Sequence, residues 1–422
     1  SNVWFEREAK DLLPEGYTHP GSPNGKFTKE TDIMDVWFDS GTSHHAALKQ
    51  KYGVEQADVY LEGSDQYRGW FNSSLSTGVA LTGKAPYKTV LSHGFTLDGE
   101  GRKQSKSLGN TIDPNKVCSE LGADIFRLWV ASVEYQADVR VDNNLLRQVS
   151  ESYRKIRNTF RFLLGNVFDF DPKENKVEFD KMPEIDQFMI CKLNEVVKAS
   201  HEAYNAYEFA EVFRTVLNFM TNELSSFYLD FTKDILYIEE ADSLARRSIQ
   251  TVFYETLLAL TTVLTPIIPH TTEEVYSYMP GDKEESIYLV DMYKYTHYHQ
   301  STELLNKYEE LMVVRSDVLK ALEEARTAKV IGKSMNALVT LYPTDKVAKL
   351  LTTLKVDLKQ VLIVYDFVVS SNDIEATAYP SGKIKVEPAT GETCSRCWQI
   401  VPTLNPDELC ERCAKVVANL KK

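Results

Sequence analysis

The hydrophobic pattern of residues 145–280 constrains the fold of this chain more than any other feature. Apolar residues recur there at intervals of three and four, as in Ile185, Phe188, Met189, Leu193, Val196 and Val197, and again in Phe209, Val212, Phe213, Val216, Phe219 and Met220. This spacing places one apolar stripe on each of several long helices. Because such stripes must be buried against one another, the pattern predicts a helical bundle.

Shorter apolar runs flank the predicted bundle. Before it, "DVWF", "DVYLEG" and "TVLSHGFTL" alternate with glycine-rich turns, which is typical of an α/β layer. After it we expect a helix over 303–328, strands at "ALVTLYP" and "VLIVYDFVVS", and a hairpin at "YPSGKIKVE". Within the bundle, "TPIIPHTTEEVY" should end one helix and start another, with Thr271 or Thr272 as its cap.

Composition limits the class of protein. The net charge of −13 over 422 residues argues against indiscriminate nucleic-acid binding, although a local basic face remains compatible with it. No apolar run approaches the length of a membrane span, and no signal-like segment opens the chain, so we expect a cytoplasmic protein without membrane contact. The chain begins with Ser1 and Asn2 instead of methionine, which predicts a fragment of a longer protein.

Four of the six cysteines lie in the stretch "CSRCWQIVPTLNPDELCERC". Cys394 and Cys397 form one pair, and Cys410 and Cys413 form a second pair after twelve intervening residues. Each two-residue spacer lets both sulfurs of a pair face one point, so four thiolates can complete a tetrahedral shell. The spacing predicts a structural zinc ion with no ligand position open to water. Two disulfides are the competing interpretation, which a cytosolic location disfavours.

One helix of the predicted bundle, "LLRQVSESYRKIRNTFRFLLG", carries four arginines: Arg147, Arg154, Arg157 and Arg161. At about 100° per residue they fall within an arc of roughly 80°. The opposite face is apolar and contains Tyr153, Ile156, Phe160 and Leu163. Because an acidic chain concentrates cations here, one hypothesis is a stripe that contacts RNA phosphates. The alternative is the solvated face of an amphipathic helix.

Polar residues follow two of the predicted strands in the first region. "YLEGSDQYRGWF" places four of them after a strand-like run: Glu62, Gly63, Asp65 and Gln66. "VLSHG" places His93 at a second strand end, and "DIMDVWFDSG" sets Trp37 in an apolar wall before a polar turn. Acids at a strand end are well placed to accept hydrogen bonds from an ammonium or a ribose. Taken singly, such residues are more often turn or structural residues.

The stretch "LDGEGRKQSKSLGN" combines three glycines with Lys103, Ser105 and Lys106. Its composition indicates a mobile cationic loop, for which simple solvation is the plain alternative.

Together these motifs resemble those of the class I aminoacyl-tRNA synthetases. "KQSKS" is similar to the KMSKS loop of that family. With "DVWFDSG", "EGSDQYRGWF", "GFTLDGEG" and the terminal "CSRCW", the chain most closely resembles the bacterial isoleucyl-tRNA synthetases, over essentially all 422 residues.

The resemblance implies an α/β plus all-α fold in five regions. These are the second half of a Rossmann-like catalytic domain (1–112), a stem-contact segment (113–145), a helical anticodon-binding domain (146–300), an α+β junction domain (301–390) and a zinc-binding tail (391–422). The implied activity is ATP-dependent formation of isoleucyl-adenylate, with Mg²⁺, and transfer of isoleucine to tRNA(Ile) by a monomer.

The resemblance also implies residue roles. Glu62 would contact the adenylate, with Gly63, Asp65, Gln66, Trp37 and His93 around it. Lys103, Ser105 and Lys106 would bind ATP, and the two lysines would be catalytic, because cations brought to the departing pyrophosphate stabilise the transition state. The arginine stripe would bind tRNA.

Two substitutions and two absences depart from the family pattern. Gln104 replaces the usual methionine of the loop, and Tyr67 stands where many relatives have histidine. The sequence contains neither a HIGH-type histidine pair nor a recognisable editing domain, which we expect before residue 1 of the parent protein. The chain alone is therefore expected to bind tRNA without aminoacylating it. The alternative function is a tRNA-binding module with an inert catalytic remnant.

Overall fold

The computed structural model describes residues 2–371 and 376–420. The chain divides into two compact units, one comprising Ser1–Thr96 with Tyr135–Val139 and the other Leu97–Glu134 with Arg140–Lys422. The chain passes between the units three times: within the short strand β3 (Thr96–Leu97), between Glu134 and Tyr135, and within the short strand β4 (Val139–Arg140). Each unit is described by itself.

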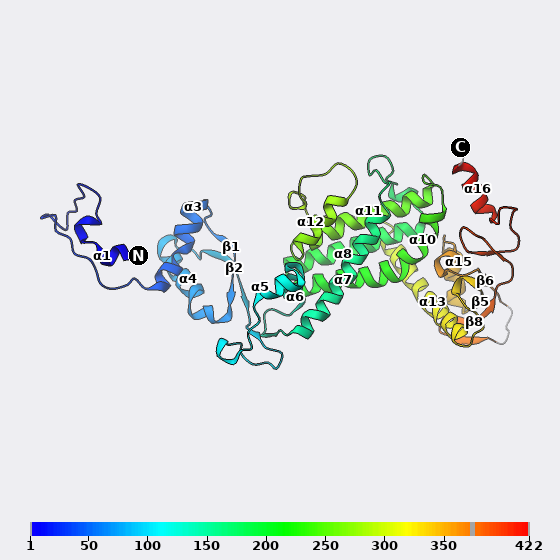
Figure 1. The fold of residues 1–422 in the computed structure, drawn as a ribbon, viewed down its shortest axis with the longest axis horizontal. Coiled ribbons are helices and arrows are strands. Elements are labelled where there is room, and N and C mark those ends of the chain that lie inside the picture. Colours follow the sequence, from blue (N-terminus) through cyan, green and yellow to red (C-terminus); the bar gives the residue numbers. More distant parts are fainter. Residues whose placement is uncertain (1, 372–375, 421–422) are drawn as a thin grey trace. The chain divides into compact units, whose positions relative to one another are not determined.

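The first unit is a small α/β layer (Figure 1). Strands β1 (Ala57–Gly63) and β2 (Tyr87–His93) pair in parallel, and helix α4 (Trp70–Thr82) connects them. Tyr60, Phe71 and Leu91 form its buried apolar centre. The remaining helices precede the sheet: α1 (Asn2–Glu6), α2 (Val36–Gly41), a π-helix (His44–Lys49) and α3 (Gln50–Tyr52). Both strands expected here are present. The first continues through Glu62 and Gly63, two residues beyond its predicted end, and the second ends at His93 as predicted.

The polar turn expected after Phe38 is wrong. Asp35 accepts a hydrogen bond from the Trp37 backbone N–H at 2.8 Å and starts helix α2, which continues through Gly41. A carboxylate at this position satisfies an unpaired N–H of the first helical turn, so the aromatic run becomes helical. Trp37 and Phe38 are about half exposed.

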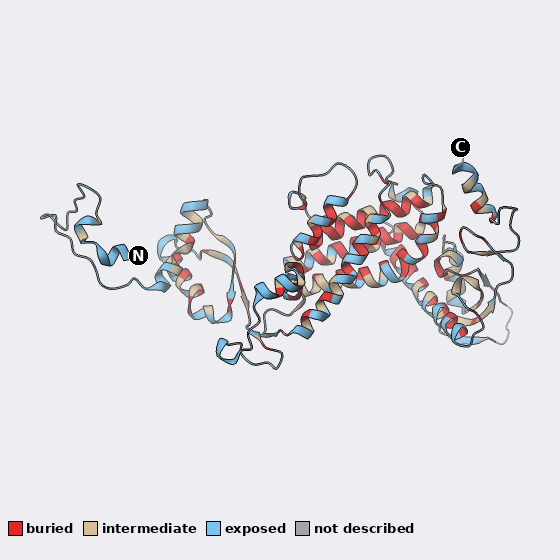
Figure 2. Cartoon of the chain, in the orientation of Figure 1, coloured by how far each residue is buried: buried red, intermediate tan, exposed pale blue. Residues whose placement is uncertain are grey.

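The second unit begins with two short helices and contains the predicted bundle. Its helices are α5 (Pro114–Leu121), α6 (Ala123–Ser132), α7 (Asn143–Gly165), α8 (Glu184–Asn205), α9 (Phe209–Asn218), a π-helix (Phe219–Tyr228), α10 (Leu229–Ile238), α11 (Leu244–Leu264), α12 (Pro269–Tyr278) and α13 (Ser301–Thr327). Figure 2 shows the buried residues concentrated in these helices. The apolar stripes of α7 and α8 are buried as predicted, with Ile156 and Leu193 at 0% exposure.

The junction of α11 and α12 corrects one expectation. Neither Thr271 nor Thr272 caps α12, because the helix already begins at Pro269. Asp124 of α6 takes the capping role: its Oδ2 accepts from the Thr271 backbone N–H and hydroxyl, both at 2.6 Å. A buried carboxylate from another helix therefore compensates the N-terminal charge of α12.

A four-stranded sheet follows the bundle, in the order β6-β5-β8-β7. Its strands are β5 (Ala337–Pro343), β6 (Asp366–Val369), β7 (Thr377–Tyr379) and β8 (Gly382–Pro388), with helices α14 (Asp345–Thr353) and α15 (Leu358–Leu362) between β5 and β6. The hairpin predicted at "YPSGKIKVE" is the antiparallel β7–β8 pair.

The strand expected over all of "VLIVYDFVVS" is wrong in its first half. Val361 and Leu362 lie in α15 and are buried there, and Ile363 ends that helix in the left-handed conformation at φ 55°. A short apolar run fits a buried helix as well as a buried strand, and packing selects between them. The tail then carries β9 (Glu392–Thr393), β10 (Ile400–Val401) and α16 (Glu411–Leu420).

Candidate functional site

The adenylate-site residues predicted from the sequence gather at the carboxyl ends of β1 and β2 in the first unit. Glu62 and His93 lie at the ends of these neighbouring parallel strands, and Glu62 Oε1 is 3.7 Å from His93 Nε2. His93 Nδ1–H donates to the Gly94 carbonyl at 2.8 Å, which directs Nε2 towards Glu62. Both side chains keep 40–50% of their surface exposed, so a ligand can reach them.

The chain after β1 has two glycines with close neighbours. A Cβ atom at Gly63 would lie 2.7 Å from Asp65 Oδ1, and one at Gly69 would lie 2.7 Å from the Trp37 ring and 2.5 Å from Gln66 Oε1. A side chain at Gly69 would displace the Trp37 ring, whereas one at Gly63 would displace only the end of the flexible Asp65 side chain. Gln66 Oε1 also accepts from the Trp70 N–H at 2.9 Å and thereby caps α4. Trp37, Gln66 and the start of α4 thus form one local cluster.

The cationic loop lies in the second unit and has defined local structure. Ser105 is the cap of a 3₁₀ turn over Lys106–Leu108, accepting from the Leu108 N–H at 3.3 Å, and Gly109 ends that turn at φ 64°. The Lys103 and Lys106 side chains are exposed and form no ion pair with any residue that the structure describes. Two exposed ammonium groups on one short loop can attract a polyanion.

Sequence reasoning missed the residues that hold this loop. Asp98 is buried at 7% exposure and receives four hydrogen bonds, one of them from Asn110. The bond from Asn110, followed by those from Arg102, holds the pKa of the Asp98 carboxyl well below its usual range, despite burial. The only available signal was an acid and an amide on opposite sides of the Lys-Ser segment.

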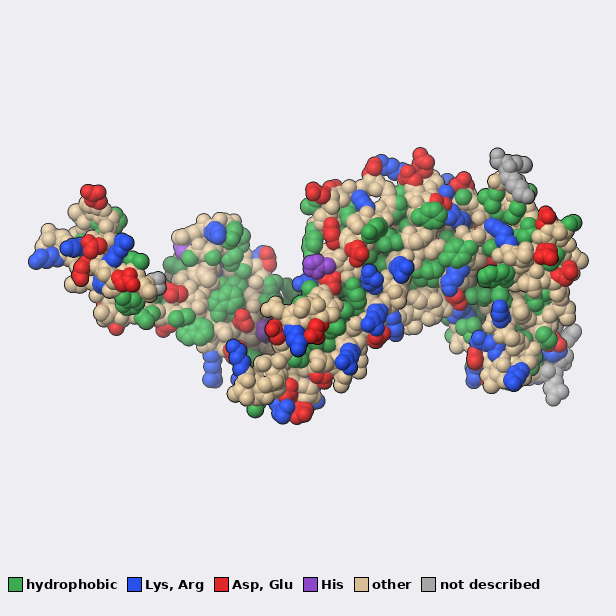
Figure 3. All heavy atoms as spheres, viewed as in Figure 1, with side chains coloured by type: hydrophobic (Ala, Val, Ile, Leu, Met, Phe, Trp, Pro, Cys, Tyr) green, Lys and Arg blue, Asp and Glu red, His purple; other side chains and the backbone are tan. Residues whose placement is uncertain are grey.

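The four arginines lie on α7, and all four are exposed. Figure 3 shows Lys and Arg side chains gathered over the part of the bundle where α7 lies. Arg154 differs from the other three, because its Nη1 lies 2.6 Å from Glu151 Oε1. Arg157 and Arg161 line a pocket of about 240 Å³ together with Tyr278 and Glu274 of α12. The face can therefore contact an extended polyanion, with Arg154 partly neutralised in advance.

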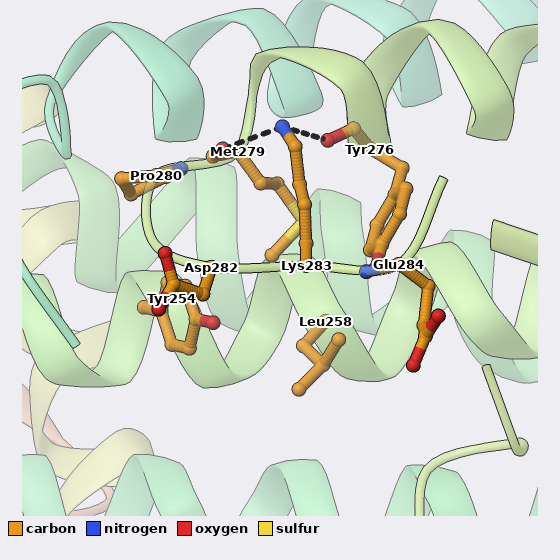
Figure 4. A pocket seen from close by; sticks show the side chains of 8 residues that line it. All are labelled: Tyr254, Leu258, Tyr276, Met279, Pro280, Asp282, Lys283 and Glu284. Carbon is orange, nitrogen blue, oxygen red and sulfur yellow. Dashed lines mark hydrogen bonds between the residues drawn. The ribbon is translucent and has the colours of Figure 1, made fainter. Parts of the chain in front are cut away.

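A larger pocket of about 460 Å³ lies beside the C-terminal end of α12 (Figure 4). Lys283 crosses it and donates to the carbonyls of Tyr276, Ser277 and Met279 at 2.6–2.8 Å. Burial lowers the pKa of Lys283. Because the ammonium satisfies the last carbonyls of α12, it acts as a helix cap, and we assign no ligand to this pocket.

The four predicted metal ligands come together in the tail. The sulfurs of Cys394, Cys397, Cys410 and Cys413 all lie within 4.8 Å of one another, and all four residues are buried. The Trp398 N–H closes the first turn on the Cys394 carbonyl at 2.9 Å, and the Cys410 N–H points to Cys394 Sγ at 3.3 Å. Backbone N–H donors directed at sulfur are the surroundings that thiolate ligands need. The cluster can hold a metal ion.

Comparison with known proteins gives the class of the chain. Residues 1–142 match the family model described as tRNA synthetases class I (I, L, M and V), and residues 186–341 match the model described as the anticodon-binding domain of tRNA ligase. The residues that match the first model include the strand ends of β1 and β2 and the cationic loop. The residues that match the second model include the larger part of the bundle. The chain belongs to the class I tRNA synthetases.

Within that class the chain is similar to isoleucine–tRNA ligases. It is 58% identical over 429 residues to the one from Geobacillus thermodenitrificans (strain NG80-2), and over 426 residues to those from Bacillus mycoides (strain KBAB4) and Bacillus anthracis (strain CDC 684 / NRRL 3495). These matches include 99% of this chain but 46% of each relative. The chain thus spans about half the length of these relatives.

A solved structure supports the fold. The ternary complex of Agrobacterium radiobacter K84 agnB2 LeuRS with tRNA and LeuAMS matches with a TM-score of 0.51 and 18% identity, covering 66% of this chain and 34% of that one. No helix among the described residues is long and apolar enough to cross a membrane.

Proposed function

We propose that this chain is part of an enzyme that activates isoleucine with ATP and transfers it to tRNA(Ile). The observation that carries the proposal is the 58% identity to isoleucine–tRNA ligases over 99% of the chain. The exposure of Lys103 and Lys106 and the proximity of Glu62 to His93 support the roles that the family resemblance implies for these residues. The five regions deduced from the sequence are proposed as its catalytic, stem-contact, anticodon-binding, junction and metal-binding parts.

The residues at the strand ends bind the adenylate in this proposal. The Glu62 carboxylate lies at an exposed strand end, where it can accept hydrogen bonds from the amino group of isoleucine or the ribose. The ligand is surrounded by Gly63, Trp37, Asp65, Gln66 and His93. The exposed side chains of Glu62 and His93 are consistent with a surface that closes around substrate.

Lys103 and Lys106 act on the triphosphate, with Ser105 as the cap of the 3₁₀ turn that begins at Lys106. Attack of the isoleucine carboxylate on the α-phosphorus breaks the bond to pyrophosphate, so negative charge grows on the leaving oxygens. Cations placed there stabilise the transition state more than the ground state. ATP enters with Mg²⁺ as substrate.

The arginine stripe of α7 binds the phosphates of tRNA. Its exposure and the acidic character of the rest of the chain support this role. The four cysteines hold a structural zinc ion, which would cross-link the two ends of the tail. Zinc fits because four sulfur ligands with C-x-x-C spacing are typical of closed tetrahedral zinc sites.

A second candidate function applies to the chain by itself, because it spans 46% of its relatives' length. It is a tRNA-binding module whose catalytic residues are inert without the remainder of the enzyme. Isoleucine-dependent exchange of pyrophosphate into ATP, measured beside a tRNA titration, separates the two. If this chain binds tRNA without exchanging pyrophosphate, the result supports the tRNA-binding module. If the full-length enzyme exchanges pyrophosphate with isoleucine, the result supports the proposed enzyme. A full-length enzyme that exchanges pyrophosphate with another amino acid instead of isoleucine would refute the first.

A further inference from the structure

The loop with Lys103 and Lys106 begins as a tight hairpin. Leu97 and Lys103 form an antiparallel bridge. Inside it, the Asp98 N–H donates to the Arg102 carbonyl and the Gly101 N–H donates to the Asp98 carbonyl, both at 2.9 Å. Gly101 has φ 80°, a conformation that glycine adopts without strain. The backbone therefore reverses direction directly before the first lysine.

The Asp98 carboxylate sits at the centre of this hairpin. Its Oδ1 accepts from the backbone N–H groups of Glu100 at 3.0 Å and Arg102 at 2.8 Å. Its Oδ2 accepts from Arg102 Nε and from Asn110 Nδ2, both at 2.9 Å. Each oxygen thus has two donors, and hydrogen bonds to an ionised acceptor are roughly twice as strong as neutral ones. Asp98 joins the start of the loop to Asn110 at its end.

Asn110 and Gln104 extend this connection across the lysine segment. Asn110 Oδ1 accepts from the Ser105 N–H at 2.9 Å, and its Nδ2 also donates to the Lys103 carbonyl at 3.2 Å. Gln104 Nε2 donates to the Leu97 carbonyl at 3.4 Å, and Gln104 Oε1 accepts from the Ile112 N–H at 3.1 Å. The backbone of the segment is thus tied at several points, while the side chains of Lys103 and Lys106 stay free. We call Asp98, Gln104 and Asn110 the loop clasp.

We propose that the loop clasp is a set of positioning residues that holds Lys103 and Lys106 in one spatial arrangement for pyrophosphate displacement. The proposal rests on the proposed function and assigns roles to residues outside the Lys-Ser motif. In this chain the glutamine at position 104 supplies hydrogen bonds to both sides of the loop. Without the clasp, the loop would be disordered before the reaction, and ordering it in every catalytic cycle would cost conformational entropy.

The test uses the full-length enzyme and swaps the side chains of Asp98 and Asn110. Asp98→Asn removes the charge and places an amide NH₂ group against donors in either flip state, because all four partners of Asp98 donate. Asn110→Asp places two carboxylates opposite each other, so each single variant weakens the contact. The double variant restores one donor–acceptor pair with the roles reversed. In isoleucine-dependent pyrophosphate exchange, each single variant should lower kcat by about 10- to 100-fold while the KM for ATP changes less than about threefold. The double variant should recover kcat at least about threefold above the better single variant.

Limited trypsin digestion gives a readout that is independent of catalysis. Cleavage after Lys103 and Lys106 should be about tenfold faster in the single variants, because their loop opens more often. Gln104→Ala removes only the contacts to the Leu97 carbonyl and the Ile112 N–H, and it should accelerate cleavage as well. This variant therefore tests the clasp if the Asp98 variants fail to fold. Asp113→Asn is the matched control: Asp113 caps α5 by accepting from the Asn115 N–H and does not contact the clasp.

The outcomes separate the clasp from the proposed function. Single variants with wild-type kcat and wild-type cleavage rates would overturn the clasp, as would a double variant no better than either single. A rise in KM for ATP at constant kcat would also overturn it, because the lysines would then act in ground-state binding alone. If the wild-type enzyme lacked isoleucine-dependent exchange, the proposed function would fail, and accelerated cleavage would still support the clasp as a structural element.

Discussion

Replacing Arg157 and Arg161 by glutamine should weaken tRNA binding and reduce the dependence of the binding constant on salt concentration, because both effects follow from lost phosphate contacts. Both side chains are exposed on α7 and have no ion-pair partner among the described residues, so each is available for a phosphate. Every phosphate contact that is lost lowers the slope of log K against log salt concentration by about 0.7 to 0.9. The double variant should therefore lose about 1.4 to 1.8 of slope.

The slope gives the expected loss of affinity. If the electrostatic contribution vanishes near 1 M salt, a slope loss of this size corresponds to about 25- to 60-fold weaker binding at 0.1 M salt. Arg154→Gln should have a smaller effect than either single variant, because Glu151 lies 2.6 Å from its guanidinium and already offsets part of its charge.

The assay is a titration of this chain with a tRNA(Ile) transcript, followed by fluorescence anisotropy at several salt concentrations. Arg214→Gln is the matched control for Arg154→Gln, since Arg214 is an exposed arginine on α9 with an i,i+3 glutamate partner, like Arg154. An unchanged slope in the Arg157/Arg161 double variant would refute the phosphate stripe and leave a solvated helix face. If Arg214→Gln had the same effect as Arg154→Gln, the response would reflect total charge instead of this face.

Three further predictions concern the loop, the tail and the bundle. In the full-length enzyme, Lys106→Ala should lower kcat of pyrophosphate exchange by about 10²- to 10³-fold, as expected for loss of one transition-state cation, and a wild-type exchange rate would contradict its role. Cys410→Ser should release the metal and unfold the tail while the bundle stays folded; metal analysis and circular dichroism check this, and a tail that stays folded under chelation would contradict it. Burial raises the pKa of Asp186 to about 7, above its unfolded value of 3.8, so its contribution favours folding at low pH and is progressively lost as the pH rises from about 4 to 7. Asp186→Asn, which can still accept the Tyr228 hydroxyl, should remove this loss and raise stability at pH 8 by up to about 4 kcal/mol, while at pH 4 the two proteins should unfold alike in urea; equal stability at pH 8 would be the contrary result.

Residue types and spacing were enough to predict the bundle, the two strands of the first unit with the end of the second at His93, and the four-sulfur cluster. In each case the determining information is local: a helical stripe repeats every three to four residues, a strand ends at a glycine-rich turn, and a two-residue spacer brings two sulfurs together. The same local reasoning failed at Phe38 and over residues 361–363, where an apolar run fits either a helix or a strand and packing selected the helix.

By itself, the sequence selected the residues that we propose carry the chemistry: the cations at Lys103 and Lys106, the arginines of α7 and the cysteines of the tail. Only the tertiary structure decided which partners hold them. The start of α12 takes its cap from Asp124, more than 140 residues earlier in the chain, and Arg154 but not Arg157 is paired with a glutamate. Such partners depend on distance and direction in the folded chain, because a hydrogen bond tolerates only a few tenths of an ångström, and sequence spacing does not encode that geometry across separate elements.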